Sequence, residues 1–213
     1  MKTQLVDLVD NRYTDKNTAY TSPIYTSACP KGIKHTGPYG HTYLPLYEEL
    51  LKDKKDTAKN ILEIGISQGG SIKLWSDYFT HADIYGVDII MRNSPPLNYL
   101  KRKSNVHLII NDAYTENFVN ETFNSKSIKF DMILDDGPHT LESMKKFVRL
   151  YTPLLKEDGI LMIEDIFYTS WFDELKKEVP NNLLKYVDTY DRRNIKNKHN
   201  DLVFVINKSK KAD

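Results

Sequence analysis

The chain has 213 residues, of which 40% are hydrophobic and 28% are charged, so it is long enough for one globular domain with a sizeable core. Its 30 basic and 29 acidic residues give a formal net charge of +1, which excludes a general attraction to nucleic acid or to an anionic membrane. The single cysteine, Cys29, excludes a disulfide or a cysteine zinc cluster within this sequence.

We expect no membrane-spanning segment and no signal peptide in this sequence. Its first twenty residues contain no apolar stretch typical of a signal peptide, and no apolar run approaches the roughly 18 residues needed to cross a bilayer. With the lone cysteine, these features predict a cytoplasmic protein that has no membrane partner and no nucleic-acid partner.

The N-terminal region, 1–57, precedes the predicted core at 58–207, and we expect the whole chain, 1–213, to be a single domain. Residues 11–38 are rich in Thr, Tyr, Ser, Lys and Pro without a clear period, which predicts an ordered but irregular segment. From 43 to 52 apolar residues recur at helical spacing, which predicts a helix.

The rest of the chain alternates between short apolar strands and helical patterns. We expect strands at 60–65, 83–88, 106–110, 130–134, 160–163, 184–190 and 202–206. We expect helices at 72–79, over part of 92–103, from 140 to 154 and within 167–179. This order predicts an α/β fold with a seven-stranded, mostly parallel sheet, helices on both faces and a C-terminal antiparallel hairpin.

The first predicted strand ends in a glycine-rich turn, Glu63-Ile64-Gly65-Ile66-Ser67-Gln68-Gly69-Gly70. Gly65 lets the backbone pass close to a ligand, and Ser71 can cap the helix whose start would bind that ligand. No Gly-Lys-Ser/Thr follows, so the turn is not the phosphate-binding loop of P-loop enzymes. Ser67 replaces the second glycine of a dinucleotide-binding turn, which disfavours a dinucleotide ligand. Glu63 suits a ligand that carries a positive group.

Acidic residues also end the second and third strands. Asp88 is placed to hold both hydroxyls of a ribose, and Asp112, which Ala113 follows, is placed to face an adenine amino group. Each acid alone is equally well explained as a solvated loop residue. Three successive strands that end in acids together predict an adenosine-containing ligand.

A fourth buried strand delivers Asp135, Asp136 and His139, and the next strand ends in Glu164-Asp165. Carboxylate oxygens without a thiolate suit a hard cation such as Mg²⁺. Because side chains alternate along a strand, the two adjacent acids can share a site only if the strand ends there. The alternative is that these acids cap helices or pair with lysines.

These motifs together resemble the class I S-adenosylmethionine-dependent methyltransferases. The shared pattern is Glu63-x-Gly65-x-x-x-Gly69, Asp88, Asp112 and Asp135. A more specific pattern resembles the metal-dependent macrolide and deoxysugar O-methyltransferases of the mycinamicin and macrocin type. It consists of Asp135-Asp136-Gly137-Pro138-His139 and Ile163-Glu164-Asp165, with Thr14-Asp15-Lys16 and His41-Thr42-Tyr43 as an N-terminal signature. The resemblance covers roughly 13–206.

The resemblance implies a Rossmann-like core that binds S-adenosylmethionine and a divalent cation, most simply Mg²⁺. We expect the cofactor to contact Glu63, Gly65, Ser71, Asp88, Asp112, Ala113 and Asp135, and the metal to be held by Asp136, Glu164 and Asp165. His139 is expected to take the proton from a sugar hydroxyl whose pKa the metal lowers. The expected reaction is Mg²⁺-dependent methylation of a sugar hydroxyl.

In the resembled family the N-terminal segment folds over the site, and members are often homo-oligomers. On that basis the candidates for substrate binding are Asp15, Lys16, His41 and Tyr43. Trp171 is a further candidate for the wall of a sugar or glycan site, although it reads equally well as part of a helix core.

Three alternatives remain at the level of sequence. A catechol-type O-methyltransferase would also use Mg²⁺, but a phenol is acidic enough to need no histidine base. A non-catalytic adenosine-binding module would be expected to have an incomplete metal or base set. A nucleic-acid methyltransferase would need a basic face, whereas the only basic cluster near a loop is 192–198.

Overall fold

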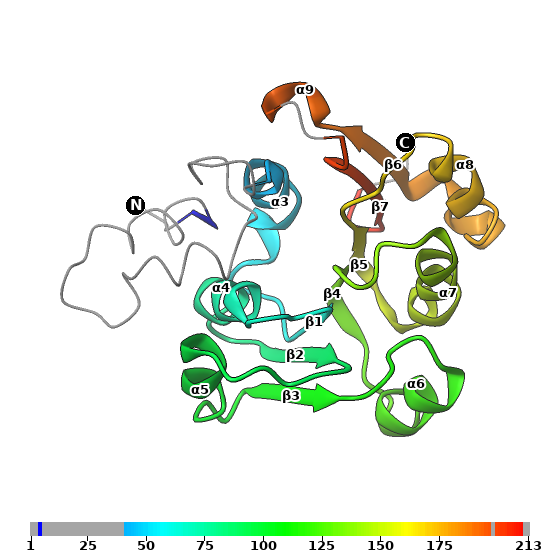
Figure 1. The fold of residues 1–213 in the computed structure, drawn as a ribbon. Coiled ribbons are helices and arrows are strands. Elements are labelled where there is room, and N and C mark those ends of the chain that lie inside the picture. Colours follow the sequence, from blue (N-terminus) through cyan, green and yellow to red (C-terminus); the bar gives the residue numbers. More distant parts are fainter. Residues whose placement is uncertain (1–3, 6–40, 197–198, 211–213) are drawn as a thin grey trace.

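The computed structural model describes residues 4–5, 41–196 and 199–210, and Figure 1 shows their arrangement. The predicted substrate residues Asp15 and Lys16, and the irregular segment 11–38, lie outside the described residues. None of the described helices is long and apolar enough to cross a membrane.

Seven strands and seven α-helices organise the described chain. The strands are β1 Asn60–Ile64, β2 Asp83–Asp88, β3 Val106–Ile110, β4 Phe130–Asp135, β5 Leu155–Ile163, β6 Val187–Asp191 and β7 Leu202–Asn207. The helices are α3 Tyr43–Leu51, α4 Gly70–Tyr78, α5 Pro95–Leu100, α6 Glu116–Thr122, α7 Leu141–Tyr151, α8 Trp171–Lys176 and α9 Arg193–Lys196. Short 3₁₀ segments lie at Lys52–Lys54, Asn124–Lys126, Thr152–Leu154 and Asn181–Tyr186.

The strands form one sheet in the order β3-β2-β1-β4-β5-β7-β6. The first five are parallel to their neighbours, and β7 is antiparallel to both β5 and β6. The predicted mostly parallel sheet with a C-terminal hairpin is therefore confirmed. The chain runs outward from β1 through β2 to β3 and then returns to β4 on the other side, and ligands of open α/β sheets bind at such a switch point.

Two hydrophobic layers cover the two faces of the sheet. Figure 1 shows the helices that lie on either side of it. The residues of β7 alternate between them: Val203 and Val205 face the layer formed with α3, α4 and α5, while Phe204 and Ile206 face the layer formed with α6, α7 and α8. Because side chains alternate along a strand, a fully buried strand must be apolar on both faces, which explains the continuous apolar runs in the sequence.

Several elements differ from those expected. The helix α6 was not predicted, since its short sequence contributes only Phe118 and Val119 to the core. The strand β5 begins at Leu155 rather than Ile160. Its pairing with β4 is irregular at this point, so the residues predicted to form a turn before Ile160 are part of the strand. The strand β6 begins three residues later than expected, after a 3₁₀ segment.

The starts of two helices that border the site are built differently. At α7 Thr140 and Ser143 form a capping box, in which the side-chain oxygen of each residue accepts a hydrogen bond from the backbone amide of the other. At α4 the predicted Ser71 cap is wrong: the cap residue is Gly69, whose φ of 77° is in the left-handed region, and no side chain caps the helix.

Candidate functional site

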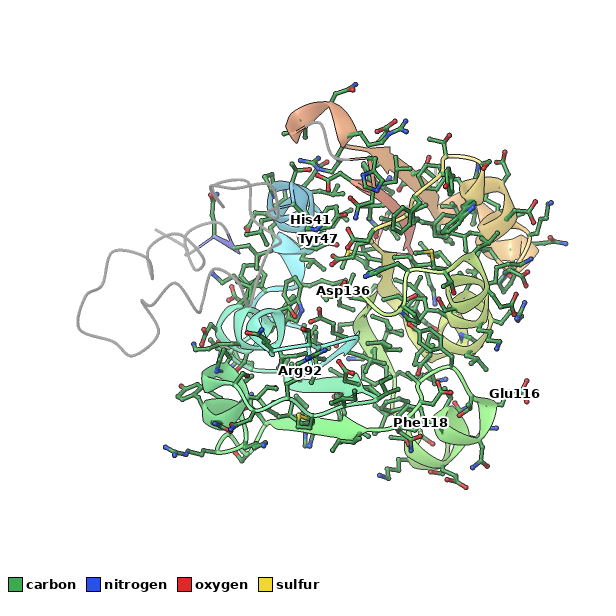
Figure 2. All side chains as sticks on the ribbon, in the orientation of Figure 1. His41, Tyr47, Arg92, Glu116, Phe118 and Asp136 are labelled. Atoms are coloured by element: carbon green, nitrogen blue, oxygen red, sulfur yellow. The ribbon has the colours of Figure 1, made fainter. Side chains whose placement is uncertain are left out.

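A cavity of about 740 Å³ opens at the carboxyl ends of β1 to β4. It extends from Arg92, after β2, to Asp136, after β4, both of which are labelled in Figure 2. The predicted site residues that line it are Gly65, Ser71, Asp88, Asp112, Ala113, Asp136 and His139. The predicted residues that do not line it are Glu63, Asp135, Glu164, Asp165, His41, Tyr43 and Trp171.

The floor of the cavity depends on a close approach of two backbones at Gly65. Its φ is 82°, and a Cβ atom there would lie 1.9 Å from the carbonyl oxygen of Asp136. The amide of Asp136 donates to the carbonyl of Ile64 at 2.8 Å, which holds the loops after β1 and β4 together. Only glycine combines this conformation with this contact.

We expect Gly65→Ala to lower the free energy of unfolding by about 1–3 kcal/mol, because the methyl group overlaps backbone that has no room to move. The same change should weaken binding of any ligand in the cavity. Chemical denaturation and ligand titration measure the two effects. The matched control is Gly86→Ala, whose Cβ would meet only side-chain atoms of Ile72 and Ile66 at 3.0–3.2 Å. Equal stability of the two variants would contradict the prediction.

Asp88 and Asp112 line the cavity at the carboxyl ends of β2 and β3. Asp88 Oδ2 accepts hydrogen bonds from the amides of Ile66 and Ser67 at 3.0 and 2.9 Å, so the acid also fixes the glycine-rich loop. Asp112 Oδ1 accepts from the amide of Tyr114 at 2.9 Å and remains exposed. Each carboxylate keeps acceptor capacity for a ligand.

Glu63 faces away from the cavity. Alternation along β1 places it on the α4 face of the sheet, where it is fully buried and Oε2 accepts from Trp75 Nε1 at 2.7 Å. The structure therefore gives Glu63 a contact to the helix behind the glycine-rich turn rather than a surface in the cavity.

Asp135 also lies behind the cavity wall. Its side chain accepts a short hydrogen bond from the hydroxyl of Tyr114, which itself lines the cavity. Burial raises the pKa of Asp135 to about 7, and the neighbouring charge of Asp136 acts in the same direction, while the Tyr114 hydroxyl opposes it. Tyr114 was not predicted from the sequence, because its role depends on a contact between separate strands.

Three predicted residues converge at the end of the cavity. His139 Nε2 lies 3.7 Å from Asp136 Oδ1 and 3.7 Å from Asp165 Oδ2, and ligand atoms of all three lie within 4.8 Å of one another. His139 Nδ1 is buried and has no hydrogen-bond partner among the described residues. Both His139 and Asp165 have positive φ values, 54° and 57°, so both residues are in the left-handed region that residues other than glycine rarely adopt.

Glu164 lies beside this group without belonging to it. The strand β5 ends at Ile163, as the two adjacent acids require, and Glu164 Oε2 accepts a short hydrogen bond from the hydroxyl of Tyr47. Burial raises the pKa of Tyr47, and the charge of Glu164 adds to that effect, so this phenol stays protonated and donates. Tyr47 comes from α3 and was not predicted as a site residue.

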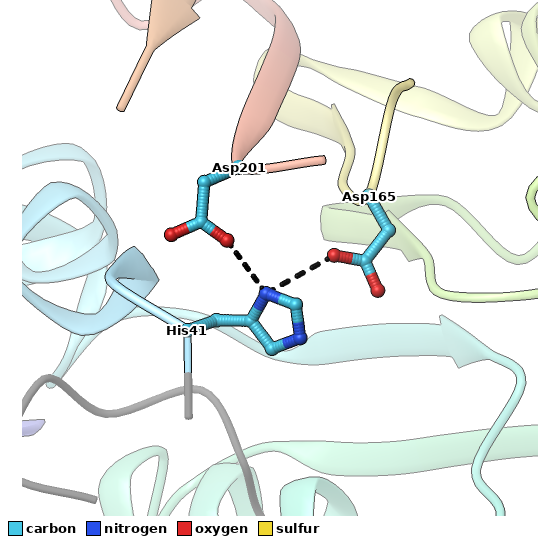
Figure 3. Close-up of side chains that lie close together, drawn as sticks. All are labelled: His41, Asp165 and Asp201. Carbon is cyan, nitrogen blue, oxygen red and sulfur yellow. Dashed lines mark hydrogen bonds and ion pairs between the residues drawn. The ribbon is translucent and has the colours of Figure 1, made fainter. Parts of the chain in front are cut away.

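His41 and Tyr43, which were predicted to bind substrate, both contact Asp165 after β5, and His41 also contacts Asp201 before β7. Figure 3 shows His41 Nδ1 between Asp201 Oδ1 at 2.7 Å and Asp165 Oδ1 at 3.2 Å. The hydroxyl of Tyr43 donates to Asp165 Oδ1 at 2.5 Å. Asp201, which precedes β7, was missed because no local pattern in the sequence distinguishes it from a loop acid.

Trp171 lies at the start of α8, outside the cavity. It is half-buried and packs against the aromatic rings of Phe167 and Tyr168, with ring centroids 6.3 and 5.4 Å away. The structure therefore places it in an aromatic cluster next to the acids after β5.

The donor atoms fit a hard divalent cation. The carboxylate oxygens of Asp136 and Asp165 converge, no described thiolate is near, and His139 Nε2 lies 3.7 Å from one oxygen of each acid. Zinc sites more often combine several histidines or cysteines, which the described cluster does not offer.

Comparison with known families matches residues 62–166 to the family described as "Methyltransferase domain". The matched range begins within β1 and ends after β5, and it includes all the residues that line the cavity.

Two curated relatives carry names that specify a sugar. The chain is 26% identical over 138 residues to 8-demethyl-8-alpha-L-rhamnosyl tetracenomycin-C 2'-O-methyltransferase of Streptomyces olivaceus, which covers 62% of this chain and 35% of that protein. It is 30% identical to L-olivosyl-oleandolide 3-O-methyltransferase of Streptomyces antibioticus, with 62% of this chain and 34% of that protein covered. The chain thus spans about a third of the length of these relatives.

A solved structure shares the fold. The MycE methyltransferase of the mycinamycin biosynthetic pathway, in complex with Mg, SAH and mycinamycin VI, superposes with a TM-score of 0.64 at 18% identity. The superposition covers 97% of this chain and 54% of that protein.

Proposed function

We propose that this chain transfers a methyl group from S-adenosylmethionine to a sugar hydroxyl of a glycosylated molecule, with Mg²⁺ as a second cofactor, and the match of residues 62–166 to the family described as "Methyltransferase domain" supports this proposal. The observation that carries the proposal is the convergence of Asp136, His139 and Asp165 at the end of a cavity lined by Gly65 and Asp88. The names of the relatives, which specify rhamnosyl and olivosyl substrates, support the substrate class.

The cavity residues would hold the methyl donor by its polar groups. The loop at Gly65 and Ser71 would admit the amino-acid end, Asp88 would accept from the ribose hydroxyls, and Asp112 with Ala113 would border the adenine. Glu63 and Asp135 would act from behind the wall, through Trp75 and Tyr114. Fixing both reactants in line is the main requirement, because the methyl group of a sulfonium is already activated.

The residues at the end of the cavity would prepare the acceptor. Asp136 and Asp165, with Glu164 adjacent, would hold Mg²⁺, which lowers the pKa of a hydroxyl group when bound. His139 would take the hydroxyl proton at Nε2, which faces the same two carboxylates. A sugar hydroxyl is a weak acid and needs such a base, whereas a catechol does not, so the position of His139 favours the sugar.

Removal of divalent cations is expected to abolish methyl transfer to nucleotide sugars and short glycans, and added Mg²⁺ should restore it. The measurement is transfer of a labelled methyl group, with and without EDTA. Full activity in EDTA would contradict a metal-dependent reaction. Methyl transfer to catechols alone, with none to any glycan, would instead support the catechol alternative.

We propose further that the chain is one domain in the cytoplasm, with the 1–57 region covering the core. Its described helix α3 supports this arrangement, because Tyr43, Leu44 and Tyr47 are buried in the same core layer as α4. We also propose a homo-oligomer, which analytical ultracentrifugation tests directly.

A further inference from the structure

His41 joins two acids that come from different parts of the sheet. Its Nδ1 atom is 2.7 Å from Asp201 Oδ1 and 3.2 Å from Asp165 Oδ1, as Figure 3 shows. A histidine nitrogen that carries a proton can donate to both oxygens, and it also separates two negative charges that would otherwise face each other. His41 is therefore a bridge between the end of β5 and the start of β7.

Asp201 is the fixed end of this bridge. It is fully buried, and its second oxygen, Oδ2, accepts from the hydroxyl of Thr42 at 3.0 Å. Arg192 Nε in turn donates to the carbonyl of Thr42 at 2.9 Å. A buried carboxylate with partners on both oxygens has little freedom, so it holds the imidazole in one orientation.

Asp165 is the end that needs support. Its φ of 57° is unusual for a residue other than glycine, and such a conformation persists only where surrounding contacts enforce it. Tyr43 supplies some of these contacts, because its hydroxyl donates to Asp165 Oδ1 at 2.5 Å and lies 3.3 Å from the Asp165 amide. The His41 ring stacks on the Tyr43 ring with centroids 4.9 Å apart. Both residues therefore hold Oδ1, and Oδ2 is left to face His139.

We propose that His41, oriented by Asp201, is a positioning residue that aims Asp165 Oδ2 at the cation site shared with Asp136. This inference rests on the proposed function, because it assigns a purpose to the bridge only if Asp165 binds a cation. It changes the role expected of His41 from substrate binding to support of a metal ligand. Side chains that orient metal ligands typically change metal affinity by about 10–100-fold when they are removed.

The test is Mn²⁺ binding to the full chain, followed by electron paramagnetic resonance, in the wild type and in two variants. His41→Ala removes the bridging donor and is expected to raise the Kd for Mn²⁺ by about 10–100-fold. His41→Asn places an amide N–H near the position of Nδ1 and should recover part of the affinity. The matched control is His107→Ala, which removes a half-exposed histidine on β3 that pairs with Asp83 at 2.8 Å.

Binding of S-adenosylhomocysteine, measured by calorimetry, separates positioning from unfolding, since His41 does not line the cavity. His41→Ala should keep this binding while it loses Mn²⁺. Unchanged Mn²⁺ affinity in His41→Ala would overturn the positioning role and leave the proposed function intact. A similar loss in His41→Asn and His41→Ala would also overturn it, as would parallel loss of S-adenosylhomocysteine binding. Absence of Mn²⁺ binding by the wild type would overturn the proposed function and this inference together.

Discussion

Replacing His139 with alanine is expected to lower kcat for methylation of a sugar hydroxyl by about 10²–10⁴-fold, the usual contribution of a positioned general base. The imidazole lines the cavity, and its Nε2 atom faces the carboxylates of Asp136 and Asp165 at 3.7 Å. Alanine keeps a Cβ atom at a φ of 54°, so the backbone preference of the position changes little. Steady-state kinetics at saturating methyl donor measure the effect.

Binding of S-adenosylhomocysteine should survive in His139→Ala, because the proposed adenosine contacts lie at Asp88 and Asp112. The matched control is His81→Ala, which removes an exposed histidine before β2, at the opposite end of the sheet. A variant of His139 that keeps most of its activity on sugars would exclude the base role. High activity on catechols in that variant would favour the catechol-type reaction.

The second large effect is expected for Asp136→Asn, which keeps the size of the side chain and removes the charge of one proposed metal ligand. A bound metal contributes several kcal/mol to the reaction, so the loss should be about 10³-fold in kcat/KM. Mn²⁺ binding should fall with activity. The hydrogen bond from the Asp136 amide to Ile64 uses the backbone and remains available to the variant.

Thermal unfolding and S-adenosylhomocysteine binding show whether Asp136→Asn keeps its fold. Asp83→Asn serves as the control, because Asp83 is a half-exposed acid at the start of β2 whose partner is His107. Retention of metal binding and activity in Asp136→Asn would place the cation elsewhere and contradict the proposed role of this acid.

The sheet was predictable because local chemistry determines it. The strands β4, β5 and β7 contain continuous apolar runs, because strands buried on both faces leave such runs in the sequence, whereas the edge strand β6 mixes apolar and polar residues. The elements that escaped prediction lack a local signal. The helix α6 has only two buried apolar residues, and the beginning of β5 passes through Lys156-Glu157-Asp158-Gly159, which reads as a turn.

The site residues likewise separate into those that have a local sequence signal and those whose contacts depend on the fold. Gly65, Asp88, Asp112, Asp136 and His139 were predictable because each follows a strand and its position at the carboxyl edge follows from the parallel topology. The contacts of the other acids were not predictable, because their partners come from other elements of the fold. These contacts are Trp75 with Glu63, Tyr47 with Glu164 and His41 with Asp165. Side chains alternate along a strand, so a shift of one residue changes whether an acid near the strand end faces the cavity or the helices behind the sheet. Glu63 faces the helices.

The position of β7 within the sheet has a consequence for folding kinetics. This strand comes last among the described strands and yet pairs between β5 and β6, and it brings Asp201 to His41 across 160 residues. Contacts of such sequence separation form late, because the chain entropy of closing the loop opposes them. During synthesis, the cavity lined by β1 to β4 can therefore assemble before Asp201 is available to orient His41 against Asp165. The nascent chain should accordingly bind S-adenosylhomocysteine at a shorter length than the one at which it gains high affinity for Mn²⁺.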